Sequence, residues 1–376
     1  MDRRPLIPFL KPQLPTVDAV AAYFARSQEV HWFSNGGPCH ALLVQRLEAM
    51  LGRQLRCVPL ANATLGLMLG MRAMVERVDP RRSEVLLPSF TFAATVNAVL
   101  WAGFKPVFVD VESESWHLCP EALSVALRSG TVAAVLACST FGTPPPRHVR
   151  DAWREAAQKE GLPLLVDSAA GFGARDEGAE LLGDSGDAEV FSFHATKPFA
   201  IGEGGLFVTS DETFAVRVER LANFGFEDGV VHRTAGFNAK LAEWPAATAL
   251  AVLDGFDGIV NARRAAADDL LGALEPHGFL RQRCDGTPAW QFVPVLAPSP
   301  ADRDLAHARA RAAGVELRTY FSVPLHRMPA FEDIRHAGPL ETTDELAARI
   351  LSLPMANDQT PAQRELIVDT LVTAVA

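Results

Sequence analysis

Several features are scarce or absent in this sequence of 376 residues, and each absence excludes a class of protein. The cysteines are an odd number, widely spaced, and none belongs to a C-x-x-C pair; they are Cys39, Cys57, Cys119, Cys138 and Cys284. This pattern argues against a disulfide framework and against a structural zinc site. We therefore expect no metal and a reducing, cytoplasmic location.

The sequence also lacks a block of basic residues and a long apolar run. Its net charge is −10, which makes it a poor candidate for binding nucleic acid or an anionic membrane. No apolar run approaches the roughly 20 residues of a transmembrane helix. The stretch from Met1 to Pro15 is interrupted by prolines and Lys11, so we expect no signal peptide.

The composition that is present is that of an ordinary globular protein, with 48% hydrophobic and 21% charged residues. At roughly 100–200 residues per domain, the length suggests two domains, or one large domain with an appendage. No Ser/Gly-rich linker and no internal repeat interrupts the chain. We therefore expect the parts to pack closely against each other.

Short apolar runs rich in β-branched residues alternate with helix-like stretches in the first 210 residues. The runs that predict strands are Cys57–Ala61, Glu84–Pro88, Pro106–Val111, Val132–Cys138, Pro163–Asp167, Ala188–Phe193 and Gly205–Thr209. The stretches that predict helices between them are Thr64–Val75, Ala93–Ala102, Pro120–Leu127 and Val149–Glu160. This alternation predicts a mostly parallel sheet covered on both faces, and mixed where the last three strands lack full helices between them.

The pattern changes after Leu250, beyond a predicted helix at Glu243–Leu253. Further helices are predicted at Asn261–Leu274, Asp302–Ala313 and Pro361–Val375, and strands at Gln291–Val295 and Val315–Arg318. We therefore expect a large α/β domain over residues 1–250 and a smaller α+β domain over residues 251–376.

Chemically useful residues follow the predicted strands at their carboxyl ends, where open α/β sheets bind ligands. Asn62-Ala63-Thr64 begins a helix, and such a turn with free N–H groups is a phosphate cradle. The alternative is that Thr64 only caps that helix. Phe92 follows the second strand, where its ring can lie on a planar cofactor, although most such phenylalanines belong to the core.

Two charged residues sharpen this interpretation. Asp167 ends an apolar strand, and a buried carboxylate needs a cation such as a protonated ring nitrogen, unless it only caps the next segment. Lys197 lies between an apolar strand and the turn Gly202–Gly205, where a partly buried lysine has a lowered pKa and can form Schiff bases. Ser192 can offer a hydroxyl to a phosphate. Together these residues suit pyridoxal phosphate.

A longer set of segments resembles a known family. They are Ser34–Pro38, Asn62–Thr64, Pro88–Thr95, Phe108–Asp110, Asp167–Gly173, Ser192–Lys197, Gly202–Gly205, Asn223–Phe226, Gly236–Glu243, Tyr320 and Pro324–His326. On these segments, from about residue 34 to the C-terminus, the chain resembles the DegT/DnrJ/EryC1/StrS family of sugar aminotransferases. The Ser-Phe-His-Ala-Thr-Lys segment with its Glu-Gly-Gly is the most specific of them.

The resemblance implies a fold type I pyridoxal phosphate enzyme, with a mostly parallel seven-stranded sheet and a smaller α+β C-terminal domain. It implies that Lys197 carries the cofactor and moves the proton, that Asp167 pairs with the pyridine nitrogen, and that Phe92 stacks on the ring. The residues implied to hold the phosphate are Ala63, Thr64, Ser192 and, from a second subunit of a homodimer, Asn238.

Further positions are implied for the substrate. Lys240 stands where the family usually has an arginine, and Tyr320 and His326 are implied to line the substrate mouth. The chain departs from the family pattern at Ala170, where many members carry a glutamine that binds the ring hydroxyl. His194 is close to the lysine in sequence, but strand alternation turns neighbouring side chains to opposite faces, which favours a structural role.

The function implied is transfer of an amino group from L-glutamate to a nucleotide-linked keto-deoxysugar, with dTDP-4-keto-6-deoxyglucose as the best guess. A sugar dehydratase would carry histidine in place of Lys197. A cyclitol or another ketone without a nucleotide is an alternative acceptor, and a regulatory or scaffold protein that binds the cofactor without turnover is another. A nicotinamide oxidoreductase is disfavoured, because Asp176 stands where the dinucleotide fingerprint has its third glycine.

Overall fold

The computed structural model describes residues 6–52, 54–75, 77–231 and 234–375. Its main sheet has seven strands in the order β1-β7-β6-β5-β4-β2-β3. They are β1 (Arg56–Leu60), β2 (Glu84–Pro88), β3 (Lys105–Val109), β4 (Val132–Cys138), β5 (Leu164–Asp167), β6 (Ala188–Ser192) and β7 (Gly205–Thr209). Only β7 runs against its neighbours, so the carboxyl ends of the other six strands meet at one edge. The predicted mostly parallel sheet is confirmed.

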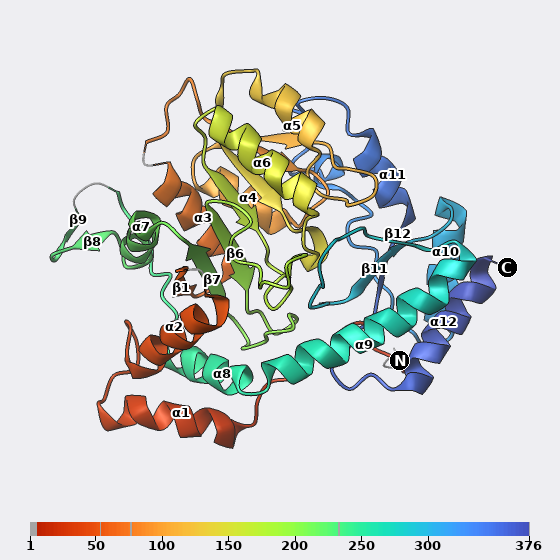
Figure 1. Cartoon of the computed structure of the whole chain (residues 1–376), viewed down its shortest axis with the longest axis horizontal. Coiled ribbons are helices and arrows are strands. Elements are labelled where there is room, and N and C mark those ends of the chain that lie inside the picture. Colours follow the sequence, from red (N-terminus) through yellow and green to blue (C-terminus); the bar gives the residue numbers. More distant parts are fainter. Residues whose placement is uncertain (1–5, 53, 76, 232–233, 376) are drawn as a thin grey trace.

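Helices cover both faces of this sheet (Figure 1). One face is covered by α3 (Ala63–Met74), α4 (Ala93–Trp101) and α7 (Glu212–Ala222). The other is covered by α2 (Pro38–Leu51), α5 (Pro120–Leu127), α6 (Arg147–Lys159) and α8 (Glu243–Leu253), with α1 (Val17–Glu29) packed against α8. The strands are apolar on both sides because both sides are buried: Leu165 faces the first set of helices, and Leu164 and Val166 face the second.

The C-terminal part has its own small sheet, in which β11 (Val293–Leu296) pairs antiparallel with β10 (Leu280–Arg281) and β12 (Ile350–Leu353). The helices of this part are α9 (Phe256–Leu274), α10 (Pro300–Ala312), α11 (Glu341–Arg349) and α12 (Pro361–Val375).

Shorter elements occur in both parts of the chain. Single 3₁₀ turns lie at Thr140–Gly142, Glu275–His277 and Leu325–Arg327. A short hairpin of β8 (Phe226–Glu227) and β9 (Val230–Val231) extends from the large sheet's side of the molecule (Figure 1).

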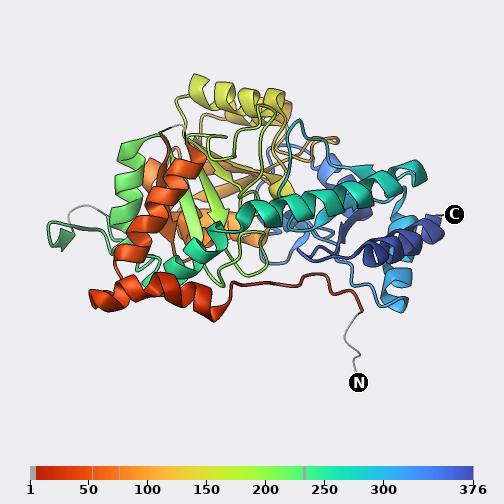
Figure 2. The ribbon, with the colours of Figure 1, turned by 60° about the horizontal axis from the view of Figure 1, so that its bottom comes forward.

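The N-terminal segment crosses from α1 to the C-terminal part, running beneath α9 in Figure 2. Ile7 and Phe9 belong to the C-terminal hydrophobic core, and Ile7 forms a bridge with Val315. The predicted strand at Val315–Arg318 is wrong: Val315 bridges to Ile7 and Arg318 to Ser352, so the segment divides its pairing between two partners. In the described ranges, no helix has both the length and the apolar character to cross a membrane.

Candidate active site

The start of α3 lies at the edge where the strands end. The helix is capped by Asn62, whose side chain accepts the backbone N–H of Leu65 at 2.9 Å. The alternative in which Thr64 caps the helix is therefore wrong. Thr64 is an exposed residue of the first helical turn, where backbone N–H groups and the helix dipole favour an anion.

Ser192 lies beside this helix start because Gly205 allows close packing. Gly205 pairs with Ser192 on one side and with Leu60 on the other. A Cβ atom on Gly205 would lie 2.6 Å from the backbone nitrogen of Ala63, closer than atoms tolerate. Because Gly205 has no side chain, the first turn of α3 can lie directly against it, next to Ser192 on the neighbouring strand β6.

Asp167 ends β5 and is only 5% exposed. Its Oδ2 accepts a hydrogen bond of 2.7 Å from the Thr95 hydroxyl, and its Oδ1 accepts the Ala169 N–H at 3.1 Å. Burial raises the pKa of Asp167, whereas these two hydrogen bonds and the charge of Lys197 lower it. Among the described residues no side-chain cation lies within 4.0 Å of this carboxylate. A buried carboxylate is stabilised by a cationic partner, and the site can accept one.

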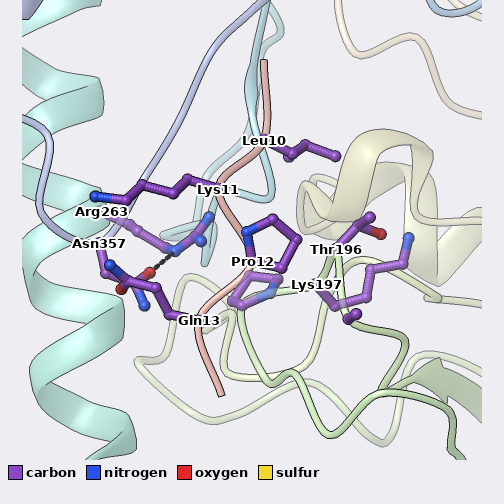
Figure 3. A pocket seen from close by; sticks show the side chains of 10 residues that line it. Leu10, Lys11, Pro12, Gln13, Thr196, Lys197, Arg263 and Asn357 are labelled. Atoms are coloured by element: carbon purple, nitrogen blue, oxygen red, sulfur yellow. Dashed lines mark hydrogen bonds between the residues drawn. The ribbon is translucent and has the colours of Figure 1, made fainter. Parts of the chain in front are cut away.

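Lys197 follows β6 in the tight turn that leads to β7. Its Nζ donates a 2.9 Å hydrogen bond to Oε1 of Gln291, from the chain just before β11. Burial lowers the pKa of Lys197 to about 8, an effect that the charge of Asp167 opposes. In Figure 3 the lysine amine points away from Lys11 and Arg263, which line the other side of a small hollow. At neutral pH the neutral form of this amine is therefore more populated than in an ordinary, exposed lysine.

These residues fit pyridoxal phosphate. The buried carboxylate of Asp167 without a cation suits a protonated pyridine nitrogen, and the amine of Lys197 suits the aldehyde. The first turn of α3 and Ser192 suit the phosphate. Phe92, which precedes α4, is 60% exposed, so its ring is available for stacking.

Comparison with known proteins decides the family. The model of the DegT/DnrJ/EryC1/StrS aminotransferase family matches residues 17–372. The chain belongs to this family. It is accordingly an aminotransferase that depends on pyridoxal phosphate, as the sequence predicted.

Individual relatives cover most of the chain. Protein MT3510 of Mycobacterium tuberculosis (strain CDC 1551 / Oshkosh) is 32% identical over 95% of this chain and 87% of its own length. The dTDP-3-amino-3,4,6-trideoxy-alpha-D-glucose transaminase of Micromonospora megalomicea subsp. nigra is 34% identical over 80% of each chain. A crystal structure of DesI in the presence of its TDP-sugar product has a TM-score of 0.89 and 32% identity, covering 99% of this chain and 93% of DesI.

The substrate residues implied by the family resemblance lie in different settings. Tyr320 is partly exposed and packs its ring against Phe9 and Phe292. His326 is buried, with Nδ1 2.8 Å from the Ser89 hydroxyl and Nε2 3.1 Å from the carboxylate of Asp344. Both ring nitrogens of His326 are therefore engaged within the protein, and contact with substrate stays a prediction for this residue.

The remaining implied positions are accessible or local. Asn238 is exposed and accepts a hydrogen bond of 2.8 Å from Nζ of Lys240 in its own chain. Ala170, which replaces the usual glutamine of the family, offers no side-chain hydrogen bond to a ring hydroxyl. His194 pairs through Nδ1 with the Thr196 hydroxyl at 2.8 Å, within the turn that carries Lys197.

The sequence did not predict two residues that hydrogen-bond to Asp167 and Lys197, namely Thr95 and Gln291. Thr95 lies within the segment Pro88–Thr95 that carries the resemblance, and its place one turn into α4 was the available signal. Gln291 had no signal, because it follows Lys197 by 94 residues and reaches the lysine only through the packing of the two parts of the chain.

Proposed function

We propose that this aminotransferase carries an amino group from L-glutamate to a keto-deoxysugar that is linked to a nucleotide. The observation that carries the proposal is that a buried carboxylate, Asp167, and a buried amine of lowered pKa, Lys197, follow neighbouring strands at one edge of the sheet. The nucleotide-linked sugars named for the Micromonospora enzyme and for DesI support this class of acceptor.

The residues divide the work as follows. The cofactor, when bound, accepts electrons from the substrate carbon and holds the amino group between the two substrates. Asp167 keeps the ring nitrogen protonated, and the Thr95 hydroxyl stabilises the charge of that carboxylate. Lys197, in its neutral form, takes a proton from the substrate carbon that bears the amino nitrogen and delivers it on the other side of that nitrogen. The first turn of α3 and Ser192 orient the phosphate.

The acceptor proposed first is dTDP-4-keto-6-deoxyglucose, from the family resemblance. The Micromonospora relative, named for a 3-amino sugar, makes the 3-keto isomer the principal alternative. The position of the ketone on the ring is therefore the variable that an assay has to test.

We also propose a cytoplasmic homodimer with shared sites, in which Asn238 and Lys240 of the partner subunit approach the phosphate and the substrate. Two groups of exposed apolar side chains support this assembly. Phe224, Phe226 and Phe237 lie on and beside the β8–β9 hairpin. Trp244 lies on α8, and Phe33 follows α1. A second copy of the chain would cover this apolar surface.

The experiment starts from protein loaded with pyridoxal phosphate, whose visible absorption band glutamate is expected to bleach. The bleached protein is mixed with a panel of 3-keto and 4-keto sugar nucleotides and keto-cyclitols, and return of the band is recorded. Return with a keto-sugar nucleotide alone supports the proposal, whereas return only with a keto-cyclitol overturns it. Lys197→Ala is expected to keep cofactor through phosphate and stacking contacts but to show neither step.

A further inference from the structure

Gln291 is held against the catalytic lysine by a directed set of hydrogen bonds. Its Oε1 accepts from Nζ of Lys197 at 2.9 Å, and its Nε2 donates to Oγ1 of Thr196 at 3.2 Å. The residue is 7% exposed, so these partners are not exchanged freely for water. We propose that Gln291 is a positioning residue that receives the Lys197 amine whenever the lysine is not attached to the cofactor. This inference rests on the role proposed above for Lys197.

The neighbouring groups fix which end of the amide faces the lysine. Nδ1 of His194 accepts the backbone N–H of Thr196, so this nitrogen carries no proton. The Thr196 hydroxyl lies 2.8 Å from the same nitrogen, which holds this side chain in place. The oxygen of this hydroxyl accepts from the NH₂ group of Gln291 at 3.2 Å. The amide oxygen consequently faces Lys197, which has only donors when it is charged.

The backbone of Gln291 is fixed from the C-terminal part of the chain. Nη1 of Arg263, on α9, donates to the carbonyl oxygens of Trp290 at 2.8 Å and Gln291 at 3.2 Å. Nε of the same guanidinium donates to Asn357 at 2.6 Å, the contact drawn in Figure 3. Arg263 is 4% exposed. Arg263 therefore holds the backbone of Gln291 in place, and the amide that accepts from Lys197 is buried beside the small sheet.

The choice of an amide has a chemical consequence. A neutral oxygen accepts an N–H from the amine without adding a negative charge, so the amine is oriented while its pKa stays low. A carboxylate at the same place would keep the amine protonated and unable to accept a proton. Gln291 thus directs the free amine during the stage in which the amino group resides on the cofactor.

The test measures Lys197 itself, in protein stripped of cofactor. An amine-reactive reagent is applied across a pH series, and modification of the Lys197 peptide is followed by mass spectrometry. Wild type is expected to give a midpoint near pH 8. Gln291→Glu should raise that midpoint by about 1 to 3 pH units, because a carboxylate favours the charged amine. Gln291→Leu should lower it, because an acceptor that favours the charged amine is removed.

Turnover supplies a second readout. With cofactor restored, Gln291→Leu should lower the rate of each half-reaction by roughly tenfold, about the effect of one hydrogen bond, with cofactor affinity unchanged. Gln282 is a matched control: it is a buried glutamine of the same part of the chain, and its Nε2 donates to the Ser115 carbonyl oxygen. Gln282→Leu should leave the midpoint of Lys197 at the wild-type value.

The outcomes are separable. Circular dichroism establishes which variants are folded, and Gln291→Leu alone decides the question if Gln291→Glu does not fold. A midpoint that is the same in wild type and in each folded Gln291 variant overturns the inference, since mere packing predicts that result. Because no sugar is used in the modification assay, failure of the proposed sugar substrate would leave this result standing.

Discussion

The hydroxyl of Thr95 donates a 2.7 Å hydrogen bond to Oδ2 of Asp167, and both side chains are buried. This bond lowers the pKa of a carboxylate that burial raises. Thr95→Val keeps the shape of the side chain and removes the donor, so the charged form of Asp167 loses stabilisation. We expect turnover to fall because the activation free energy rises by ~1.5–3 kcal/mol, the range for a hydrogen bond to a charged group. Single-turnover rates with glutamate would measure this loss.

A second helical threonine provides the control for that substitution. Thr248 is also buried, and its hydroxyl donates to the Trp244 carbonyl oxygen within α8. Thr248→Val should leave the rate with glutamate close to that of wild type. Equal losses in the two variants would show that removing a buried hydroxyl, and not the bond to Asp167, slows the enzyme.

Asp167→Asn is expected to fold normally and to lose most of its activity. An amide cannot keep the ring nitrogen protonated, so the ring accepts electrons less readily. The loss in activation free energy should be about 2–4 kcal/mol, as for removal of one electrostatic stabiliser in other active sites. Steady-state kinetics measure it, and a rate within a few-fold of wild type would reduce the aspartate to a structural role.

The pH dependence of cofactor attachment follows from Lys197. Only the neutral amine attacks an aldehyde, and burial lowers the pKa of Lys197 to about 8. In cofactor-free protein, the rate of covalent attachment should therefore rise with pH through about 8 and level off above it. Since the charge of Asp167 raises this pKa, Asp167→Asn should move the midpoint to lower pH. A rate that rises instead near pH 10, the range of an ordinary lysine, contradicts the prediction.

The sheet could be predicted from the sequence because each buried strand is a short apolar run bounded by turn residues. The predicted bounds agree with the structure at both ends for Glu84–Pro88, Val132–Cys138 and Gly205–Thr209. The rule that ligands bind at the carboxyl ends of parallel strands then grouped Asp167 and Lys197 at one edge. That grouping needed only the order of residues along each strand.

Other features could not be predicted because they depend on contacts between distant segments. Gln291 reaches Lys197 across 94 residues, and Glu243 accepts backbone N–H groups of α2 across more than 200. The segment Val315–Arg318 has strand-like residues, but whether such a segment joins a sheet depends on which neighbours have free hydrogen-bonding groups. Periodicity along the chain carries no information about these partners.

Glu243 illustrates such a contact, and its removal should destabilise the fold. Its carboxylate is fully buried and accepts the N–H groups of Cys39 at 2.7 Å and His40 at 2.9 Å, at the start of α2. Gly37, the N-cap, has no side chain to do this. Glu243→Ala leaves those groups unsatisfied, and we expect a loss of about 2–4 kcal/mol in the free energy of unfolding, measured in urea.

The control is Glu212, which occupies the same first helical position in α7 but lies at the surface, where it pairs with Arg56 at 3.3 Å. Glu212→Ala should change stability by no more than about 1 kcal/mol, because exposed ion pairs contribute little. Comparable losses in the two alanine variants would contradict the capping role of Glu243.

The proposed sharing of sites between subunits can be tested by complementation. Lys197→Ala lacks the amine, and Asn238→Asp places a negative charge where the cofactor phosphate of the other subunit is proposed to bind, so each variant alone should be inactive. If Asn238 acts across the interface, a mixed dimer contains one site with both native residues. Random exchange then makes half of the dimers mixed, and activity should return to about a quarter of wild type by symmetry. Mass spectrometry of the intact mixture establishes that subunits have exchanged. If exchange is complete and no activity returns, or if the wild-type monomer is fully active, each site belongs to a single chain.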